Sequence, residues 1–172
     1  MSEGTVCIFH AWSIDRSRAK NQNGEISIAD ITKGLPYADD QFDVVFSKSM
    51  LEHFYHPEIV IAGMHRVLKP GGVLIAMVPD WQTCWKLFYN DPFHCHPFTQ
   101  KGLHDSLLIA GFEKVETEIF YQLPFLWTYP KLAPLCRLLS FLVPVYRHNN
   151  LLRFSRHLML LSSAYKGDFD EV

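Results

Sequence analysis

Hydrophobic and polar positions alternate in blocks between residues 39 and 79, and the pattern predicts a strand, a helix and a second strand. The run 42–46 is short and apolar and follows a polar turn, which is typical of a strand buried on both faces. From Glu58 the apolar residues recur at helical spacing, and we expect the Lys-Pro-Gly-Gly of 69–72 to end that helix. A second buried strand follows over 73–78. A strand–helix–strand unit is right-handed, so these two strands should lie parallel.

The flanking sequence predicts a longer sheet around this unit. Four further strands are expected from apolar or alternating runs: 5–12, 25–30, 115–120 and 156–166. Residues 99–110 have leucines on one side and predict an amphipathic helix, with Thr99 as its N-cap and Gly111 in the left-handed position at its end. Strands and helices therefore belong to one α/β domain.

Length and composition agree with a single globular domain. The chain has 172 residues, of which 48% are hydrophobic and 20% are charged, so we expect one domain over 1–172. Its sheet core should comprise 1–120 and 156–166, with a hydrophobic insertion or lid over 121–155. The net charge of −2 gives no basic field that would attract nucleic acid. The four cysteines form no CxxC pair, and we expect a reduced, cytoplasmic protein.

Two phrases of the sequence carry a family resemblance. LPYADDQFDVVFSKSMLEH (35–53) is followed by HRVLKPGGVLIAMVP (65–79). This ordered series resembles the second half of a class I S-adenosylmethionine-dependent methyltransferase of the small-molecule type. The resemblance implies a Rossmann-like, mostly parallel sheet whose last strand is antiparallel at the sheet edge. It also implies S-adenosylmethionine as cofactor and methyl transfer as the reaction.

The N-terminal part departs from the family pattern. The family begins with a strand that enters a glycine-rich loop around the methionine part of the cofactor, whereas this chain has no GxGxG and Gly4 stands alone. The span 6–30 is also too short for the missing elements, because a strand–helix–strand unit needs ~30 residues. We therefore expect an N-terminally truncated or reduced fold. The missing strand is central in the family, so a groove between unpaired strand edges is expected, open to another chain.

The resemblance also implies cofactor contacts. Asp15 corresponds to the acidic residue that binds the ribose hydroxyls, although an ordinary turn aspartate fits equally. Asp30 corresponds to the residue that meets the adenine amino group, with Ile31 packing on the ring; a helix-cap or turn role is the alternative. Ser47 and Lys48 directly follow the 42–46 strand, at the edge where their backbone would face the cofactor.

Three histidines are candidate bases for deprotonating an acceptor. His94 and His96 belong to a loop that in similar methyltransferases lies over the acceptor pocket, and His53 follows the 42–46 strand. Plain loop and turn roles are the alternatives. A metal site is a further alternative for the loop, with four residues that could be ligands: Asp91, His94, Cys95 and His96. Neighbouring His-Cys-His residues chelate poorly, so no metal is expected there.

The stretch 121–155 is apolar and interrupted by prolines, and three uses remain open for it. It could form a lid over the acceptor pocket, a peripheral membrane contact through 121–150, or a homodimer contact. Membrane contact would suit a lipid-linked acceptor.

Two functions from different classes follow from these observations. The first is S-adenosylmethionine-dependent methyl transfer to a small-molecule, glycan or lipid-linked acceptor. The second is a methyltransferase-like domain without activity that serves in binding or assembly, which the missing glycine loop favours. A nicotinamide oxidoreductase is disfavoured because its phosphate-binding glycines are absent as well.

Overall fold

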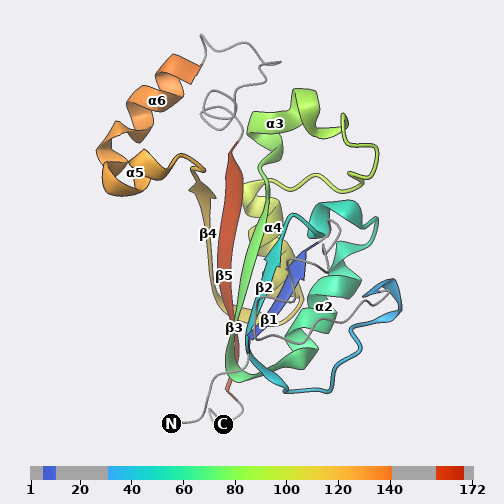
Figure 1. The fold of residues 1–172 in the computed structure, drawn as a ribbon. Helices are drawn as coiled ribbons and strands as arrows, with labels where there is room; N and C mark the ends of the chain where they lie inside the picture. Colours follow the sequence, from blue (N-terminus) through green and yellow to red (C-terminus); the bar gives the residue numbers. More distant parts are fainter. Residues whose placement is uncertain (1–5, 11–30, 141–157, 169–172) are drawn as a thin grey trace, which may run out of the picture.

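The computed structural model describes residues 6–10, 31–140 and 158–168, which form a five-stranded sheet flanked by helices (Figure 1). The strand order is β1-β2-β3-β5-β4. The strands have the following bounds: β1 Val6–His10, β2 Phe42–Lys48, β3 Leu68–Pro79, β4 Phe112–Phe120 and β5 Met159–Lys166.

The predicted parallel pair is confirmed. β2 and β3 run parallel, with Val45 opposite Leu74 in register. The helix between them, α2 (Pro57–Val67), begins with a proline in its first turn as the sequence predicts. The carboxyl ends of both strands therefore meet at one edge of the sheet.

The strand β1 corrects the expected groove. β1 pairs in parallel with β2 from Val6 opposite Val44 to His10 opposite Lys48. The backbone groups of β2 on that side therefore have partners, as buried backbone groups require. The prediction of unpaired edges beside the 42–46 strand is wrong for this side of β2. The strand expected over 25–30 lies outside the described residues.

The position of the last strand is a second correction. β5 is antiparallel as expected, but it lies between β3 and β4 and not at the sheet edge. The physical reason lies in the side chains: Leu160 and Ala164 of β5 are fully buried. β4, in contrast, exposes the charged side chains of Glu116 and Glu118, which is how natural edge strands avoid further pairing.

The junction between α2 and β3 is the third difference. α2 ends at Val67 and β3 begins at once, so residues 69–72 belong to an irregular strand start and not to a helix end. Gly71 has φ +73°, and the register with β2 shifts between Phe42 and Val44. The sequence suggested a glycine with a left-handed backbone at a helix end. The structure has that left-handed glycine, but within the first residues of a strand.

The core lies between one face of the sheet and two helices. α2 and α4 (Gln100–Ile109) lie on the same side of the sheet (Figure 1). Leu74, Ala76 and Val78 of β3 are fully buried, and they alternate along the strand, as residues on one face do.

The other face of the central strands is less enclosed. Val44 and Val73 are only half-buried, while their neighbours Val45 and Leu74 are fully buried. The prediction of complete burial on both faces therefore holds for one face only.

Short helices gather at the carboxyl ends of the parallel strands. α3 (Trp81–Phe88) follows β3, and α5 (Pro124–Thr128) and α6 (Ala133–Ser140) follow β4 at the upper left of Figure 1. The described residues also form three single-turn helices: η1 (Ile31–Lys33), η2 (Leu51–His53) and η3 (Pro130–Leu132). None of the helices in the described segments has the length and apolar character to cross a bilayer.

Candidate functional site at the carboxyl edge of the sheet

The carboxyl ends of β2 and β3 are shaped by two residues, Ser49 and Asp80. Ser49 has φ +49°, and its N–H donates to the carbonyl of Met77 at 2.9 Å. A left-handed backbone is uncommon for a residue other than glycine and often marks a functional position. Asp80 is 2% exposed, and its side chain caps α3 by accepting from the N–H of Gln82 at 3.3 Å. Both strands therefore end in tightly fixed turns.

The predicted cofactor residues fall partly at this edge. The backbone of Ser47 is paired with both β1 and β3, and its buried hydroxyl has no hydrogen-bond partner within the described part of the chain. Lys48 is the last residue of β2. Ile31 begins η1 and packs against the core. The positions of Asp15 and Asp30 lie outside the described residues, so their roles stay predictions.

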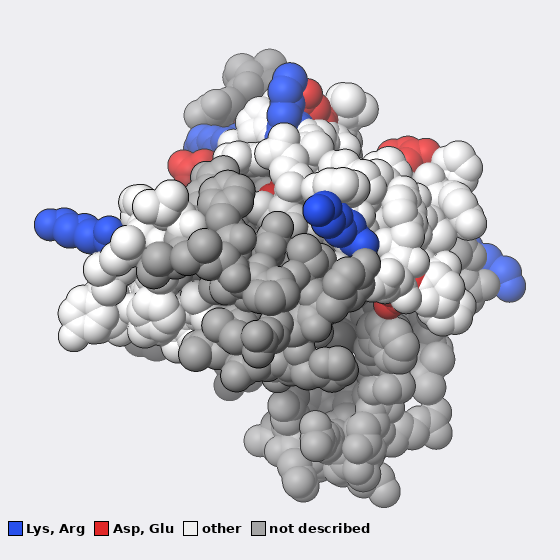
Figure 2. Space-filling view, turned by 90° about the horizontal axis from the view of Figure 1, so that it is seen from above, with Lys and Arg blue, Asp and Glu red and all other residues white. Residues whose placement is uncertain are grey.

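The described part of the face at this edge is mostly uncharged (Figure 2). Figure 2 is viewed from above Figure 1, onto the carboxyl ends of the parallel strands. On the described part of that face, Lys and Arg side chains stand apart from one another between larger uncharged areas. The expectation that nucleic acid is no partner stays a prediction.

Directly after β2, the single-turn helix η2 carries a buried carboxyl group. Glu52 is 1% exposed, and neither oxygen of its carboxyl group has a hydrogen-bond partner among the described residues. Burial raises the pKa of Glu52 from its usual 4.5 to about 7, and the nearby charge of Asp91 raises it further, against the opposing effect of the backbone at Glu52. A carboxyl group with such a pKa exchanges its proton near neutral pH.

Two of the predicted bases lie beside Glu52. His53 Nδ1 donates to the carbonyl of Phe93 at 3.2 Å, and His94 Nδ1 donates to the carbonyl of Phe88 at 2.8 Å. The two imidazole rings have their centroids 4.8 Å apart. One ligand atom from each of Glu52, His53 and His94 lies within 4.8 Å of the others. The structure thus joins residues that are about 40 positions apart.

Backbone hydrogen bonds hold this cluster together. The carbonyl of Glu52 accepts from the N–H of Cys95 at 2.8 Å and from the N–H of His96 at 3.0 Å. The loop that contains His94 is therefore tied to η2 independently of the side chains. Burial lowers the pKa of His53, and the neighbouring His94 lowers it further, partly offset by the carbonyl of Phe93 and the charge of Asp91.

His96 does not belong to the cluster. Its ring lies against Phe98 with centroids 4.7 Å apart, and burial lowers its pKa, against a raising effect of Glu58. Cys95 donates its thiol to the carbonyl of Phe93 at 3.3 Å. In the described part of the chain the group that could hold a metal is Glu52 with His53 and His94, not the four loop residues that the sequence suggested.

The sequence analysis therefore missed Glu52. The signal in the sequence was a lone acidic residue just after a buried strand, preceded by the apolar Met50 and Leu51 and followed by His53. That pattern also fits a simple surface turn, so only the burial of Glu52 distinguishes the two.

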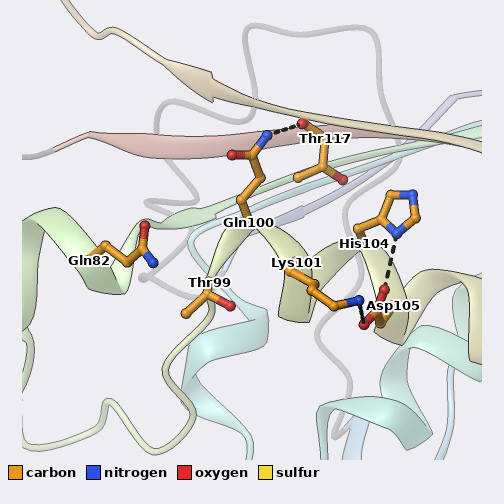
Figure 3. A pocket seen from close by; sticks show the side chains of 7 residues that line it. All are labelled: Gln82, Thr99, Gln100, Lys101, His104, Asp105 and Thr117. Carbon is orange, nitrogen blue, oxygen red and sulfur yellow. Dashed lines mark hydrogen bonds and ion pairs between the residues drawn. The ribbon is translucent and has the colours of Figure 1, made fainter.

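A separate hollow of about 470 Å³ lies between the start of α3, the first turns of α4 and the edge strand β4 (Figure 3). Seven residues line it: Gln82, Thr99, Gln100, Lys101, His104, Asp105 and Thr117. Several of their polar groups already bind one another. Gln100 donates to the carbonyl of Thr117 at 2.6 Å, and Lys101 pairs with Asp105 at 2.6 Å. None of the predicted site residues lines this hollow.

The fold and this edge define a Rossmann-like α/β protein with a site at the carboxyl ends of its parallel strands. A sequence model of a methyltransferase domain family matches residues 8–76, from β1 to β3. The ubiquinone/menaquinone biosynthesis C-methyltransferase of Blochmanniella pennsylvanica is 32% identical over 78 residues, 44% of this chain and 31% of that protein. The ubiquinone biosynthesis O-methyltransferase of Pseudomonas syringae pv. tomato is 44% identical over 48 residues, 28% of this chain and 19% of that protein.

A solved structure shows the same fold. An S-adenosylmethionine-dependent methyltransferase from Mesorhizobium loti superimposes with a TM-score of 0.61 at 17% identity, over 94% of this chain and 80% of that one. The partial sequence match and the shared fold support the resemblance to class I S-adenosylmethionine-dependent methyltransferases that the sequence indicated. The matches span about a third or less of the curated relatives' length. Nothing in them favours the alternative of an inactive domain.

Proposed function

We propose that this chain transfers a methyl group from S-adenosylmethionine to a small-molecule, glycan or lipid-linked acceptor. One observation carries the proposal: the family match over 8–76 falls on β1, β2 and β3, whose carboxyl ends meet at one edge. In open parallel sheets the ligand binds outside that edge. The two ubiquinone-pathway relatives named above methylate small molecules according to their names.

The residues at this edge fit the adenosyl part of the cofactor in two respects. The hydroxyl of Ser47 is buried and lacks a partner, so it can bind a polar group that enters the edge. Ile31 is half-buried and offers an apolar surface next to the position of Asp30. When bound, the cofactor supplies the activated methyl group. The chain itself then has to hold the acceptor in line with that group and to exclude water.

A hydroxyl acceptor would also need a base. His94 is our first candidate, because its Nδ1–H is held by the carbonyl of Phe88 and its Nε2 is left to accept a proton. His96 and His53 are the second and third candidates, in the order that the sequence suggested. Burial lowers the pKa of both, which favours the neutral imidazole, the form that accepts a proton.

Contact of 121–150 with a membrane or a second copy stays a prediction. Trp127 and Tyr129 are each 61% exposed, and Leu138 is 66% exposed. Such side chains suit an interfacial contact. Co-sedimentation with lipid vesicles tests it, and a protein that stays in the supernatant at all lipid compositions contradicts it.

Calorimetry with S-adenosylmethionine and S-adenosylhomocysteine tests the proposed function directly. We expect 1:1 binding, weakened at least about tenfold in Asp30→Ala, because an adenine contact is lost. Asp105→Ala, in the separate hollow, is the matched control and should bind like the original chain. No heat at millimolar cofactor would contradict the function. Unchanged affinity in Asp30→Ala would overturn only the adenine assignment.

The acceptor side has its own assay. Release of S-adenosylhomocysteine is measured over a panel of phenols, amines and glycosides, with the His94→Asn variant beside the original chain. If His94 is the base, kcat for a phenol falls about 100-fold or more while cofactor affinity is kept. An equal loss in His104→Asn, a histidine outside the edge, would contradict a specific role of His94.

A further inference from the structure

We propose that Glu52, His53 and His94 form a binding site for a divalent transition-metal ion of the Zn²⁺ class. One ligand atom of each residue lies within 4.8 Å of the other two. Two imidazoles and one carboxylate are the ligand types that Zn²⁺ and its first-row neighbours take in proteins with an open fourth position. The site does not depend on the proposed methyl transfer.

The buried carboxyl group of Glu52 is the strongest argument. It is 1% exposed and, among the described residues, neither of its oxygens has a hydrogen-bond partner, although buried charged groups in proteins are normally paired or coordinate a metal. A dication beside this carboxylate would supply the missing partner.

The two histidines are oriented as metal-binding histidines usually are. Each donates its Nδ1–H to a main-chain carbonyl, His53 to Phe93 and His94 to Phe88. This arrangement fixes the neutral tautomer and leaves the lone pair on Nε2.

The charge around the cluster also favours a cation. Asp91 lies next to His94, with one carboxylate oxygen 3.8 Å from His94 Nε2. The other oxygen of Asp91 accepts from the N–H of Phe93 at 2.9 Å, which fixes the side chain. Glu52 and Asp91 thus place two carboxyl groups beside the two imidazoles, and a dication at this position is attracted by their ionised forms.

Only a small movement is needed to close the site. Ligand atoms around a tetrahedral metal at ~2.1 Å stand roughly 3.4 Å apart, so atoms that are now within 4.8 Å must approach by about 1.4 Å or less. The backbone of η2 and the loop is already joined at Glu52, Cys95 and His96, so the proposal requires movement of the side chains and not of the backbone. His53 and His94 are half-buried, so an ion can enter from their side.

The metal site and the base assignment can be told apart. An imidazole whose Nε2 binds a metal cannot take a proton from an acceptor, so His96 would be the remaining free candidate. The two proposals are tested by separate binding measurements. If the chain binds metal but no cofactor, only the proposed methyl transfer fails; if it binds cofactor but no metal, only the metal site fails.

Titration of the chelator-treated full chain with ZnCl₂ tests the proposal, with Co²⁺ absorption as the second readout. We expect one ion per chain, a ligand-field spectrum with Co²⁺, and a higher melting temperature with Zn²⁺. Glu52→Gln and His94→Asn should each weaken binding about tenfold or more. His104→Asn is the control, because His104 pairs with Asp105 at 3.3 Å as a histidine–carboxylate pair outside the cluster.

Two outcomes overturn the proposal. The first is an affinity for Zn²⁺ that is equal in the original chain and in Glu52→Gln, which would mean that the ion binds elsewhere. The second is the absence of binding at millimolar metal. Glu52→Gln removes a charge from a buried position and is expected to fold, so it decides the question even if His94→Asn does not fold.

Discussion

The buried carboxyl group of Glu52 makes the stability of the metal-free protein depend on pH. Its pKa in the folded protein is about 7, against 4.5 for the ordinary group. The folded state therefore holds a proton that the unfolded state releases between pH 4.5 and 7. Below pH 4.5 the carboxyl group is protonated in both states and costs no stability. Between pH 4.5 and 7 it ionises only in the unfolded state, so the free energy of unfolding falls as the pH rises. Above pH 7 the loss stays constant.

The size of the effect follows from the same two values. One pKa unit corresponds to about 1.4 kcal/mol, so the rise from 4.5 to about 7 corresponds to about 3 kcal/mol. Glu52→Gln keeps the shape of the neutral acid and cannot ionise. We expect it to be only about 1 kcal/mol more stable than the original chain at pH 5, near the start of the window, and about 3 kcal/mol more stable at pH 8.5.

Urea unfolding at both pH values, with EDTA present, measures this difference. Comparing the two proteins at each pH removes the contributions of the other titratable groups, because both proteins contain them. Glu118→Gln, on the exposed face of the edge strand β4, is the control and should show no pH-dependent gain. If Glu52→Gln differs from the original chain by the same amount at both pH values, Glu52 does not carry a raised pKa. With Zn²⁺ in place of EDTA the trend should reverse, because metal binding favours the ionised carboxylate.

Two further substitutions test the packing and the start of α4. Leu107→Ala removes a fully buried side chain and should lower the free energy of unfolding by about 2–5 kcal/mol, whereas Ile109→Ala, at a position 85% exposed, should change it by less than about 0.5 kcal/mol in the same urea experiment. Thr99→Ala removes the cap that accepts from the N–H of Gly102 at 3.1 Å and should cost about 1 kcal/mol, while Thr99→Ser restores it; equal stability of all three would show that the cap contributes nothing.

Local signals in the sequence were sufficient for α4, for the start of α2 and for the parallel pair. The caps at Thr99 and Gly111 bound α4 at both ends as expected, because capping depends on neighbouring residues only. The parallel pairing of β2 and β3 followed from the handedness of a single crossover. Local signals did not predict that β5 lies between β3 and β4. The order of strands in a sheet depends on comparing distant strands, because the strand with exposed charged side chains takes the edge.

The candidate site depends on contacts between distant parts of the chain, and that explains what the sequence analysis missed. His94 was found by its residue type and its loop, but its partners Glu52 and His53 belong to a different element. Two hydrogen bonds from Cys95 and His96 to the carbonyl of Glu52 join these elements, and backbone hydrogen bonds leave no trace in residue types. The same two bonds keep the loop against η2 whether or not Glu52 is charged. The carboxyl group therefore stays in its buried position and, above pH 7, remains ionised without a partner, which is the condition under which a metal ion gains most by binding.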